Sequence, residues 1–538
     1  MDDQGRRNPL YSSGSVAANR TGLKSSPSVK SPLHSSGSVP STSSGKSPLH
    51  SSGSLPASRT GKSFLHSSGS VAARTSRDSS PANGSGVRRN PLYSSGSITA
   101  QGSIEKKERA HDEFWAGPES VPESVVDVGV RQSLLEDLAL KILYLSGPFS
   151  LRELATHTRL PFTVVNELLR RMRAEKLCEL TGMTGNVPQI AITSLGRTRA
   201  AELMMVNQYT GPAPVSLDHY KQQVRNQSVR HLDVDEPLVE QAFGHLVLDA
   251  EMLEKLGTAL NSGTSIFLYG PSGTGKTTIA SALAQVLAVD RVWMPYAVEV
   301  EGQIICVYDP DVHKKINDPV AQSCDQRWVL CHRPTVLVGG ELTLEMLELQ
   351  FNPVTKIYAA PVQMKANNGV LIIDDFGRQR MRPEELLNRW VVPLDRGIDF
   401  LTMAGGKKIE IPFEPCVVFA TNLEPSALGD EAFLRRIQTK IKVGGVSEEQ
   451  FHAIFHAVCG TCGLQAGGEL IDELIQIIRQ KLNEPLRACQ PRDLVNRICW
   501  KARYKRMEPC LDRDTMLAAV DAYFLRKDDK GNEEVQEA

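Results

Sequence analysis

SIFLYGPSGTGKTTIASALAQVL, residues 265–287, carries the strongest structural signal in the chain. An apolar run predicts a buried strand, a glycine-rich loop follows, and an alanine- and leucine-rich run predicts a helix. The loop fits the pattern GxxxxGK followed by Ser or Thr, in the strand–loop–helix context that this pattern requires. Because glycine has no Cβ, main-chain N–H groups can converge on phosphate oxygens there, and the helix N-terminus adds its dipole. The expected nucleotide-binding residues are Gly270, Pro271, Ser272, Gly273, Thr274, Gly275, Lys276, Thr277 and Thr278.

A second apolar strand, VLIIDDFG at residues 370–377, ends in two neighbouring acids. Asp374 closes the strand and is expected to hold Mg²⁺ through its water shell, with the hydroxyl of Thr277 as a further ligand. Asp375 follows, where a base can orient the attacking water. Lys276 is expected to reach the β- and γ-phosphates. The sequence therefore predicts that ATP and Mg²⁺ are cofactors and that ATP is hydrolysed.

Two further motifs follow the acidic strand. CVVFATN, residues 416–422, is a third apolar strand with a polar end at Asn422. DEAFLRRI, residues 430–437, has an apolar helical stripe and places Arg435 and Arg436 at the helix end. Such a pair is either an exposed surface pair or a source of positive charge for a phosphate.

The C-terminal part of the chain, residues 446–525, has the periodicity of amphipathic helices. Within it, QPRDLVNRI places Arg492 at the start of a helix, with Arg487 as the alternative arginine. This region is predicted to form a helical lid.

In this order the motifs resemble those of AAA+ ATPases, over about residues 237–525. The resemblance implies that Asn422 is the sensor 1 residue, on a strand beside the acidic one, and that Arg492 is the sensor 2 residue of the lid. It implies that Arg435 or Arg436 is an arginine finger that reaches the site of a neighbouring subunit. A finger of this kind requires a homo-oligomer, such as a hexameric ring.

Further stretches of sequence indicate which groups of AAA+ ATPases the chain resembles. IDFLTMAGGKKIEIPFE, residues 398–414, predicts a β-hairpin around a Gly-Gly turn. It resembles the hairpin before sensor 1 in MoxR-like ATPases and in bacterial enhancer-binding transcription activators. The GAFTGA loop of those activators is absent, which argues against their function. The runs GGEL, DDFGRQ and FLRRI resemble uncharacterised bacterial AAA+ ATPases with an N-terminal winged-helix-like domain. AAA+ proteins more often have Glu where this chain has Asp375.

Residues 131–205 have the pattern of a winged helix: three amphipathic helices, two short strands around a Gly/Asn turn, and a closing helix. The predicted third helix begins after Pro161 and offers Arg170, Arg171, Arg173 and Lys176 to a phosphate backbone. Glu167 and Glu175 interrupt this basic patch. Contact with DNA, docking of a protein and a plain scaffold role all remain open.

Residues 1–110 are of low complexity and contain five copies of a short unit, such as NPLYSSGSV from Asn8 and SPLHSSGSV from Ser31. Residues 1–104 hold 12 Lys and Arg against 3 Asp and Glu, which is +9, so the remainder carries −1 − 9 = −10. So little apolar surface predicts disorder. The tail is either a tether or a string of binding motifs whose repetition raises the effective concentration.

The bulk composition excludes several classes. The 10 cysteines are spread widely, unlike those of a disulfide scaffold, which indicates reduced intracellular thiols. No apolar run approaches the roughly 18 residues of a membrane helix, and no apolar segment follows the N-terminal residues as in a secretion signal. A cytoplasmic protein without membrane insertion is expected.

The predicted fold class is α/β: an AAA+ core with a mostly parallel sheet and a helical lid, after a winged-helix-like domain and a disordered tail. The long stretch 290–365 between the first two motifs is expected to contain an insertion that carries either a pore loop or an element that contacts a substrate. The predicted segments are a tail at 1–110, a winged-helix-like domain at 131–205, a linker at 206–236, the core at 237–445, the lid at 446–525 and a disordered end at 526–538.

The expected activity is ATP hydrolysis that remodels a macromolecule, because lid motion does mechanical work. A protein client is favoured, since the part of the chain after the tail is acidic. The alternatives are a DNA-acting or transcription-linked motor that binds DNA through the winged helix, and a nucleotide switch with slow turnover. Stimulation by DNA with a steep salt dependence would indicate the DNA-acting motor.

Overall fold

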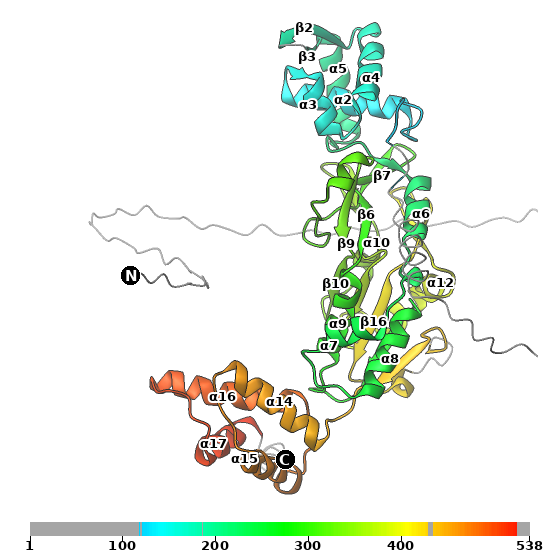
Figure 1. The fold of residues 1–538 in the computed structure, drawn as a ribbon. Helices are drawn as coiled ribbons and strands as arrows, with labels where there is room; N and C mark the ends of the chain where they lie inside the picture. The colour runs from blue at the N-terminus through cyan, green and yellow to red at the C-terminus, as the bar shows by residue number, and fades with distance from the viewer. Residues whose placement is uncertain (1–117, 119–120, 185–186, 429–433, 525–538) are drawn as a thin grey trace, which may run out of the picture. The chain divides into compact units, whose positions relative to one another are not determined.

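The computed structural model describes residues 118, 121–184, 187–428 and 434–524 (Figure 1). The predicted tails at 1–110 and 526–538 lie outside the described residues. No helix among the described residues is long and apolar enough to cross a membrane.

The first folded region contains four helices and a small sheet. Its strands pair antiparallel in the order β1-β3-β2. Ser150 caps α3 with a capping box: its hydroxyl accepts from the N–H of Glu153, and the Glu153 carboxylate accepts from the N–H of Ser150. The apolar stripe predicted for α4 is buried. The elements are α2 (Gln132–Ser146), β1 (Phe149–Ser150), α3 (Leu151–Thr158), α4 (Phe162–Ala174), β2 (Cys178–Thr184), β3 (Val187–Ile192) and α5 (Ser194–Val206).

The stretch 206–236 differs from the polar linker predicted there. It forms β4 (Val215–Ser216), α6 (Leu217–Asn226) and the short 3-10 helix η1 (Val229–His231). Tyr220 of α6 is fully buried and its hydroxyl accepts a hydrogen bond of 2.9 Å from Asn367. The few apolar residues of this stretch are widely spaced, so a search for periodicity misses them, but they pack against a sheet formed by later residues.

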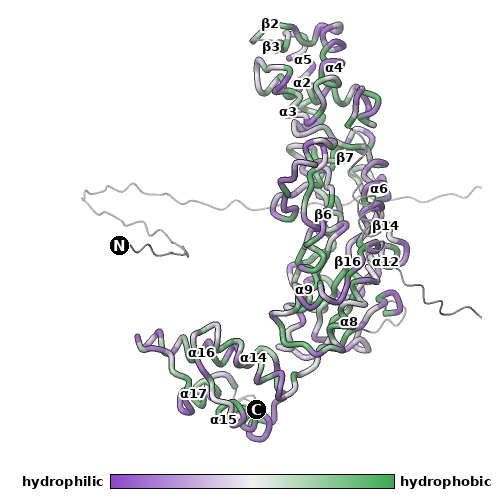
Figure 2. The backbone as a smooth tube through the Cα atoms, in the orientation of Figure 1, coloured by the Kyte–Doolittle hydropathy of each residue, from purple (hydrophilic) through white to green (hydrophobic). Residues whose placement is uncertain are grey.

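The core sheet has five parallel strands in the order β10-β13-β16-β5-β17. The strand before Asn422, β16, lies beside the acidic strand β13, as expected, and pairs on its other side with β5, the strand of the glycine-rich loop. The centre of the core sheet is apolar, and the stretches around α9 and β16 are largely green in Figure 2. The strands are β5 (Ile266–Tyr269), β10 (Thr335–Val338), β13 (Val370–Ile373), β16 (Cys416–Thr421) and β17 (Thr439–Lys442).

Helices cover both faces of this sheet. One apolar cluster joins Ile266, Ile372 and Val418 to α7 (Glu236–Phe243), α8 (Ala250–Asn261) and α9 (Lys276–Ala288). Alternate residues of the same strands, including Phe267 and Phe419, form a second cluster on the opposite face. This cluster includes residues of α11 (Pro383–Arg389) and α12 (Val391–Arg396). Both faces are therefore buried, as is usual for a parallel sheet.

The insertion predicted at 290–365 includes the core strand β10, and the rest of it forms a β-rich subdomain. Its main sheet has the order β11-β12-β8-β7-β4, so β4 from the stretch before the core is an edge strand of it, and β6 pairs with β9. The elements are β6 (Arg291–Pro295), β7 (Ala297–Val300), β8 (Gln303–Cys306), η2 (Pro319–Ser323), β9 (Trp328–His332), η3 (Leu344–Leu347), β11 (Gln350–Asn352), β12 (Ile357–Ala359) and α10 (Val362–Lys365).

The predicted hairpin is present as β14 (Ile398–Thr402) and β15 (Lys408–Pro412), paired antiparallel with Phe400 opposite Glu410. Its inward residues Leu401, Ile409 and Ile411 share an apolar cluster with the inserted sheet. The hairpin and the insertion are therefore packed together.

The C-terminal region is helical, with its own apolar core around Phe451 and Phe455. A short 3-10 helix, η4 (Pro425–Leu428), and strand β17 precede it. Its elements are α14 (Glu448–Thr461), α15 (Gly468–Gln476), the π-helical turn η5 (Ile477–Lys481), α16 (Cys489–Lys505) and α17 (Arg513–Tyr523).

Candidate functional site

The glycine-rich loop between β5 and α9 needs its glycines. Gly270, Gly273 and Gly275 have φ angles of 143°, 80° and 94°, which side chains rarely allow. A Cβ at Gly270 would lie 2.2 Å from the carbonyl oxygen of Val443. The loop therefore presents a cradle of main chain directly before the N-terminus of α9, which attracts anions.

Lys276 lies at the centre of the site. Only 8% of its surface is exposed. Its ammonium group donates to the carbonyl oxygens of Gly270 at 2.9 Å and Pro271 at 2.7 Å, and to the side-chain oxygen of Asn422 at 2.8 Å. Burial lowers the pKa of Lys276, and the charges of Asp375 and Asp374 oppose this shift. The loop and the end of β16 thus meet at one buried cation.

The acids after β13 lie next to the loop. The hydroxyl of Thr277 donates to the carboxylate of Asp374 at 3.0 Å. The side-chain amide of Asn422 is 3.4 Å from the carboxylate of Asp375, whose backbone has a positive φ of 47°. Five predicted residues from three neighbouring strands and one helix therefore converge: Lys276, Thr277, Asp374, Asp375 and Asn422.

Sequence reasoning did not single out Gln379. Its side-chain nitrogen donates to the carbonyl oxygens of Asp374 at 2.9 Å and Asp375 at 3.2 Å, and its oxygen accepts from the N–H of Gly377 at 2.7 Å. These bonds hold the turn that carries both acids. The run DDFGRQ contains this glutamine, but only its contacts reveal its role.

The first turn of α16 touches the loop. The N–H of Cys489 donates to the carbonyl oxygen of Gly273 at 3.1 Å. A Cβ at Gly273 would lie 2.5 Å from the Cys489 sulfur and 3.6 Å from Cδ of Arg487. The Nε of Arg487 is buried without a hydrogen-bond partner among the described residues. Cys489 was not predicted, since a single cysteine has no sequence pattern.

The two predicted arginine positions of the lid differ in their contacts. The side chain of Arg492 is 63% exposed and pairs with the adjacent Asp493 at 3.2 Å. Arg487, the alternative, pairs with Glu484 at 3.0 Å and lies beside the loop. Arg492 follows Cys489 by three residues, so both are on one face of α16.

The predicted finger helix is described only in part, because residues 430–433 lie outside the described residues. Arg436 forms an ion pair of 2.8 Å with Asp395 of α12. Arg435 is exposed.

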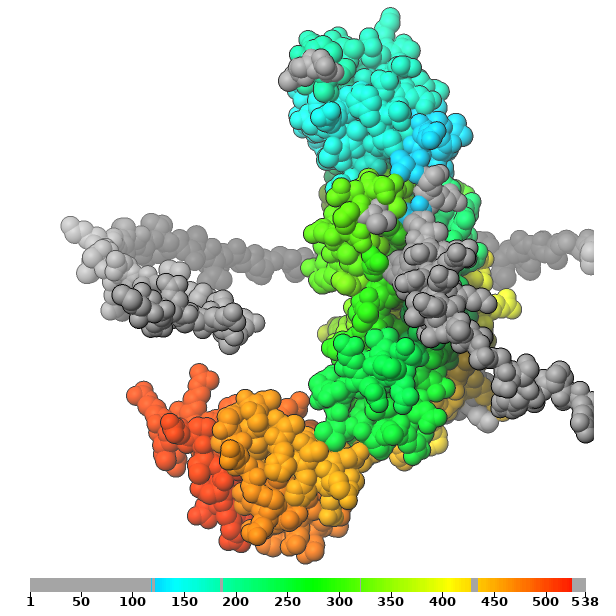
Figure 3. Space-filling view, viewed as in Figure 1, coloured from blue at the N-terminus to red at the C-terminus, as the bar shows by residue number. Residues whose placement is uncertain are grey.

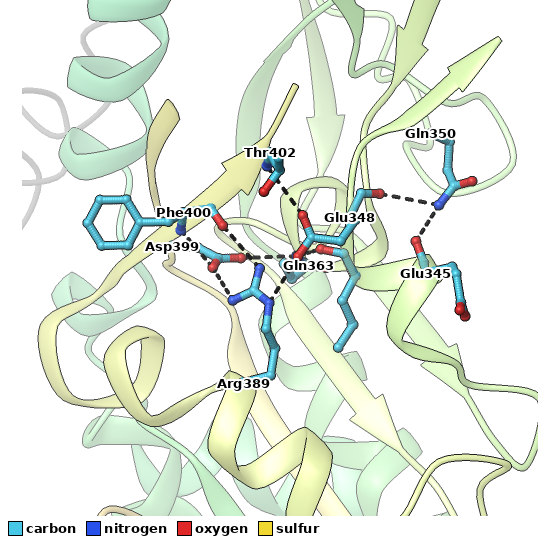
Figure 4. A network of polar contacts seen from close by, with 9 residues as sticks. Glu345, Glu348, Gln350, Gln363, Arg389, Asp399, Phe400 and Thr402 are labelled. Carbon is cyan, nitrogen blue, oxygen red and sulfur yellow. Dashed lines mark hydrogen bonds and ion pairs between the residues drawn. The ribbon is translucent and has the colours of Figure 1, made fainter. Parts of the chain in front are cut away.

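A polar network connects α11, which follows the acids, to the hairpin and the insertion (Figure 4). Arg389 of α11 forms ion pairs with Asp399 of β14 at 2.5 Å and with Glu348 of the insertion at 3.1 Å. The Asp399 side chain is fully buried and also accepts from Gln363 at 3.0 Å. One arginine therefore ties three separate segments together.

These residues suit a nucleotide with Mg²⁺. The main-chain cradle and Lys276 match phosphate oxygens, and the Thr277 hydroxyl and Asp374 carboxylate are hard oxygen ligands of the kind that Mg²⁺ prefers. The fold and site define a P-loop nucleotide-binding domain.

Comparison with known families agrees with this class. Residues 266–444 match the family model "ATPase family associated with various cellular activities (AAA)". The chain therefore carries an AAA domain. Residues 447–522, the C-terminal helices, match a "Domain of unknown function (DUF8689)". No curated protein matches the sequence.

Solved structures with detectable similarity include AAA+ proteins. NtrX from Brucella abortus in complex with ADP has 16% identity and a TM-score of 0.33, with 53% of this chain and 58% of NtrX covered. Domain III of the replication initiation protein DnaA from Thermotoga maritima has 12% identity and a TM-score of 0.31, with 53% and 98% covered. The Thermotoga maritima RuvB Holliday junction branch migration motor has 12% identity and a TM-score of 0.30, with 51% and 69% covered. The chain thus spans less than two thirds of the NtrX chain.

Proposed function

We propose that this chain is a Mg²⁺-dependent ATP hydrolase that uses ATP to remodel a macromolecular client, a protein or a protein assembly. The convergence of Lys276, Thr277, Asp374, Asp375 and Asn422 at one end of the core sheet carries the proposal. Each has the side-chain chemistry that binding or hydrolysis of a nucleoside triphosphate requires.

Lys276 and the loop hold the phosphates in this proposal. The lysine is charged, largely buried and already bonded to the loop, so its position changes little when phosphate oxygens take the place of its present acceptors. Thr277 and Asp374 hold the Mg²⁺ ion. When bound, the ion neutralises the negative charge that builds up on the phosphate oxygens.

Asp375 and Asn422 act on the attacking water. Asp375 is the base that accepts its proton. The side-chain amide of Asn422 lies 3.4 Å from the Asp375 carboxylate and accepts from the ammonium group of Lys276, so it fixes the positions of these two groups relative to each other. Gln379 fixes the main chain of both acids and is a positioning residue.

The link from hydrolysis to remodelling runs through two connections. The main-chain N–H of Cys489 in the lid donates a hydrogen bond to the carbonyl oxygen of Gly273 in the loop. A nucleotide bound by the loop therefore lies next to the first turn of α16. Arg389, 14 residues after Asp375 (389 − 375 = 14), forms ion pairs with the hairpin and the insertion. We infer that these two elements contact the client.

We further propose that the protein acts as a homo-oligomeric ring, for instance a hexamer, with an arginine finger from each neighbour. Arg435 is the better finger by exposure, because it is exposed whereas the Arg436 side chain is 26% exposed. The lid would close over the nucleotide with Arg492 directed at the γ-phosphate.

A second candidate function is a DNA-acting motor. The helices and three-stranded sheet of residues 132–206 support a winged-helix interpretation, and Arg170, Arg173 and Lys176 on or after α4 are exposed. Arg171 is also exposed but forms an ion pair of 3.1 Å with Glu136. The three remaining cations suit a phosphate backbone.

The test is steady-state ATP hydrolysis by the purified chain over a range of protein concentrations, with and without double-stranded DNA at two salt concentrations. Hydrolysis whose specific rate rises with protein concentration and ignores DNA supports the self-assembling protein remodeller. Stimulation by DNA that fades at high salt supports the second candidate. Absence of Mg²⁺-dependent hydrolysis under every condition would overturn both.

A further inference from the structure

The C-terminal half of α16 carries aromatic side chains on its solvent face. The helix spans Cys489–Lys505, but its buried residues end at Ile498. Trp500 and Tyr504 are 63% and 89% exposed, and Met507, just past the helix, is 64% exposed. With 3.6 residues per turn, Trp500 and Tyr504 lie on one stripe, opposite the stripe of Leu494, Val495 and Ile498 that packs on the lid core. These aromatic rings are therefore not needed for the core.

The same segment is strongly basic. Between Asp493 and Glu508 the chain has no acidic residue and five cations: Arg497, Lys501, Arg503, Lys505 and Arg506. The last four are exposed. The orange-red end of the lid that includes this segment projects from its body in Figure 3. Exposed aromatic rings among cations that have no nearby acidic residue in sequence are typical of surfaces that bind single-stranded nucleic acid, where the rings stack on bases and the cations contact phosphates.

A hollow lies beside Trp500, between α16 and α17. Its volume is about 190 Å³, and its walls include Trp500, Arg497, Lys501 and the small residues Ala518, Ala519 and Ala522. The guanidinium of Arg497 is held over the ring of Tyr523 at 5.6 Å, so one cation at the rim has a fixed place. Pockets for whole small-molecule ligands measure roughly 300–1,000 Å³. The hollow is smaller, which suits one ring of a longer ligand.

We propose that the exposed face of α16 from Arg497 to Met507, together with this hollow, binds single-stranded nucleic acid. Bases stack on Trp500 and Tyr504, and Lys501, Arg503, Lys505 and Arg506 neutralise the phosphates. An acidic peptide is the competing ligand. Lysine is depleted in protein–protein interfaces, whereas lysine and arginine serve equally to neutralise phosphate, so the composition favours nucleic acid. The surface is separate from the nucleotide site and from the basic helix α4.

The experiment is fluorescence anisotropy of a labelled 20-nucleotide oligo(dT) titrated with the full chain at 50, 100 and 200 mM NaCl. Trp500→Ala with Tyr504→Ala should weaken binding at least tenfold at each salt concentration. Lys501→Ala, Lys505→Ala and Arg506→Ala together should flatten the slope of log affinity against log salt by about 2, since single strands contribute roughly 0.7 per phosphate contact.

Matched controls separate this face from other exposed rings and cations. Tyr144→Ala with Phe162→Ala removes two exposed rings outside the lid, and Arg382→Ala with Lys255→Ala removes exposed cations of the core. All variants should keep the unfolding temperature of the parent chain, because the altered side chains are exposed.

Three outcomes overturn the proposal. The first is a folded Trp500 and Tyr504 variant that binds oligo(dT) as tightly as the parent chain. The second is a 20-base-pair duplex that binds as tightly as oligo(dT) with no loss on removal of the two rings, which means that charge alone acts. The third is poly-glutamate that binds with the same affinity and shows the same loss, which assigns the face to acidic peptides.

Discussion

The ammonium group of Lys276 lies 2.8 Å from the side-chain oxygen of Asn422. Lys276 begins α9, directly after the loop that follows β5, and Asn422 follows β16; β5 and β16 pair in parallel. Parallel pairing brings the carboxyl ends of both strands to one edge, so a lysine and an asparagine 146 positions apart in sequence meet there.

Lys276→Ala should weaken ATP binding by roughly 10- to 100-fold, the effect of losing charge-assisted hydrogen bonds to phosphate. Isothermal titration with MgATP measures this. Lys255→Ala is the control, since the side chain of that lysine is 54% exposed and its ion pair is with Glu251 on the same helix. Equal affinity of Lys276→Ala and the parent chain would remove the loop from the nucleotide site.

Asp375→Asn should keep MgATP affinity and lower the rate of hydrolysis by about 10²- to 10⁴-fold, because the amide cannot accept the proton of the attacking water. Asp375→Glu extends the carboxylate by one methylene and should retain part of the activity. Single-turnover hydrolysis with saturating ATP separates the chemical step from binding. Full activity of Asp375→Asn would mean that another group is the base.

Arg492→Ala should reduce affinity for ATP more than affinity for ADP, by about tenfold, because a sensor 2 arginine contacts the γ-phosphate. Arg487→Ala should change both affinities alike, since its side chain packs against Gly273 at the loop. Titration of both variants with the two nucleotides decides between them. The reverse pattern would assign the γ-phosphate contact to Arg487.

The core could be predicted because its signals are local. Ile266 to Tyr269, the loop and α9 form one contiguous motif, and the acids directly follow an apolar strand. The hairpin was also predictable, since its strands alternate around a Gly-Gly turn. These elements are determined by residues that are close in sequence.

The rest depends on contacts between distant residues. Val215 and Tyr220 are buried only because residues of the insertion, more than 70 positions later, form a sheet beside them. The contact of Cys489 with Gly273 joins positions 216 residues apart (489 − 273 = 216). No local sequence pattern links the two residues of such a contact. The linker prediction therefore missed Val215 and Tyr220, and the search for site residues missed Cys489.

Arg389→Met should destabilise the core by about 3–5 kcal/mol, because it leaves the fully buried carboxylate of Asp399 without its ion-pair partner. Arg389→Met combined with Asp399→Asn should recover much of this loss, since the buried charge is then removed as well. Urea unfolding of both variants and of the parent chain gives the comparison. A double variant that is less stable than the single one would show that the network contributes in another way.

Lys141 gives the N-terminal helices a dependence on pH. Burial lowers the pKa of its ammonium group to about 8 from the ordinary value of 10.5, with the charge of Asp137 opposing the shift. The group donates to the side-chain oxygen of Asn207 at 2.6 Å, which ties α2 to the end of α5. Between these pH values the unfolded chain holds a proton that the folded chain has released.

The free energy of unfolding should therefore rise with pH between about 8 and 10.5, with a slope of at most about 1.4 kcal/mol per pH unit from this group, and this contribution is lost as the pH falls through 8. Lys141→Met removes the titration. In calorimetric scans from pH 7.5 to 10.5, the unfolding temperature of the parent chain should increase relative to that of Lys141→Met as the pH rises. Parallel curves for the two proteins would show that Lys141 keeps an ordinary pKa in the folded chain, and the buried bond to Asn207 would then be that of a permanently charged lysine.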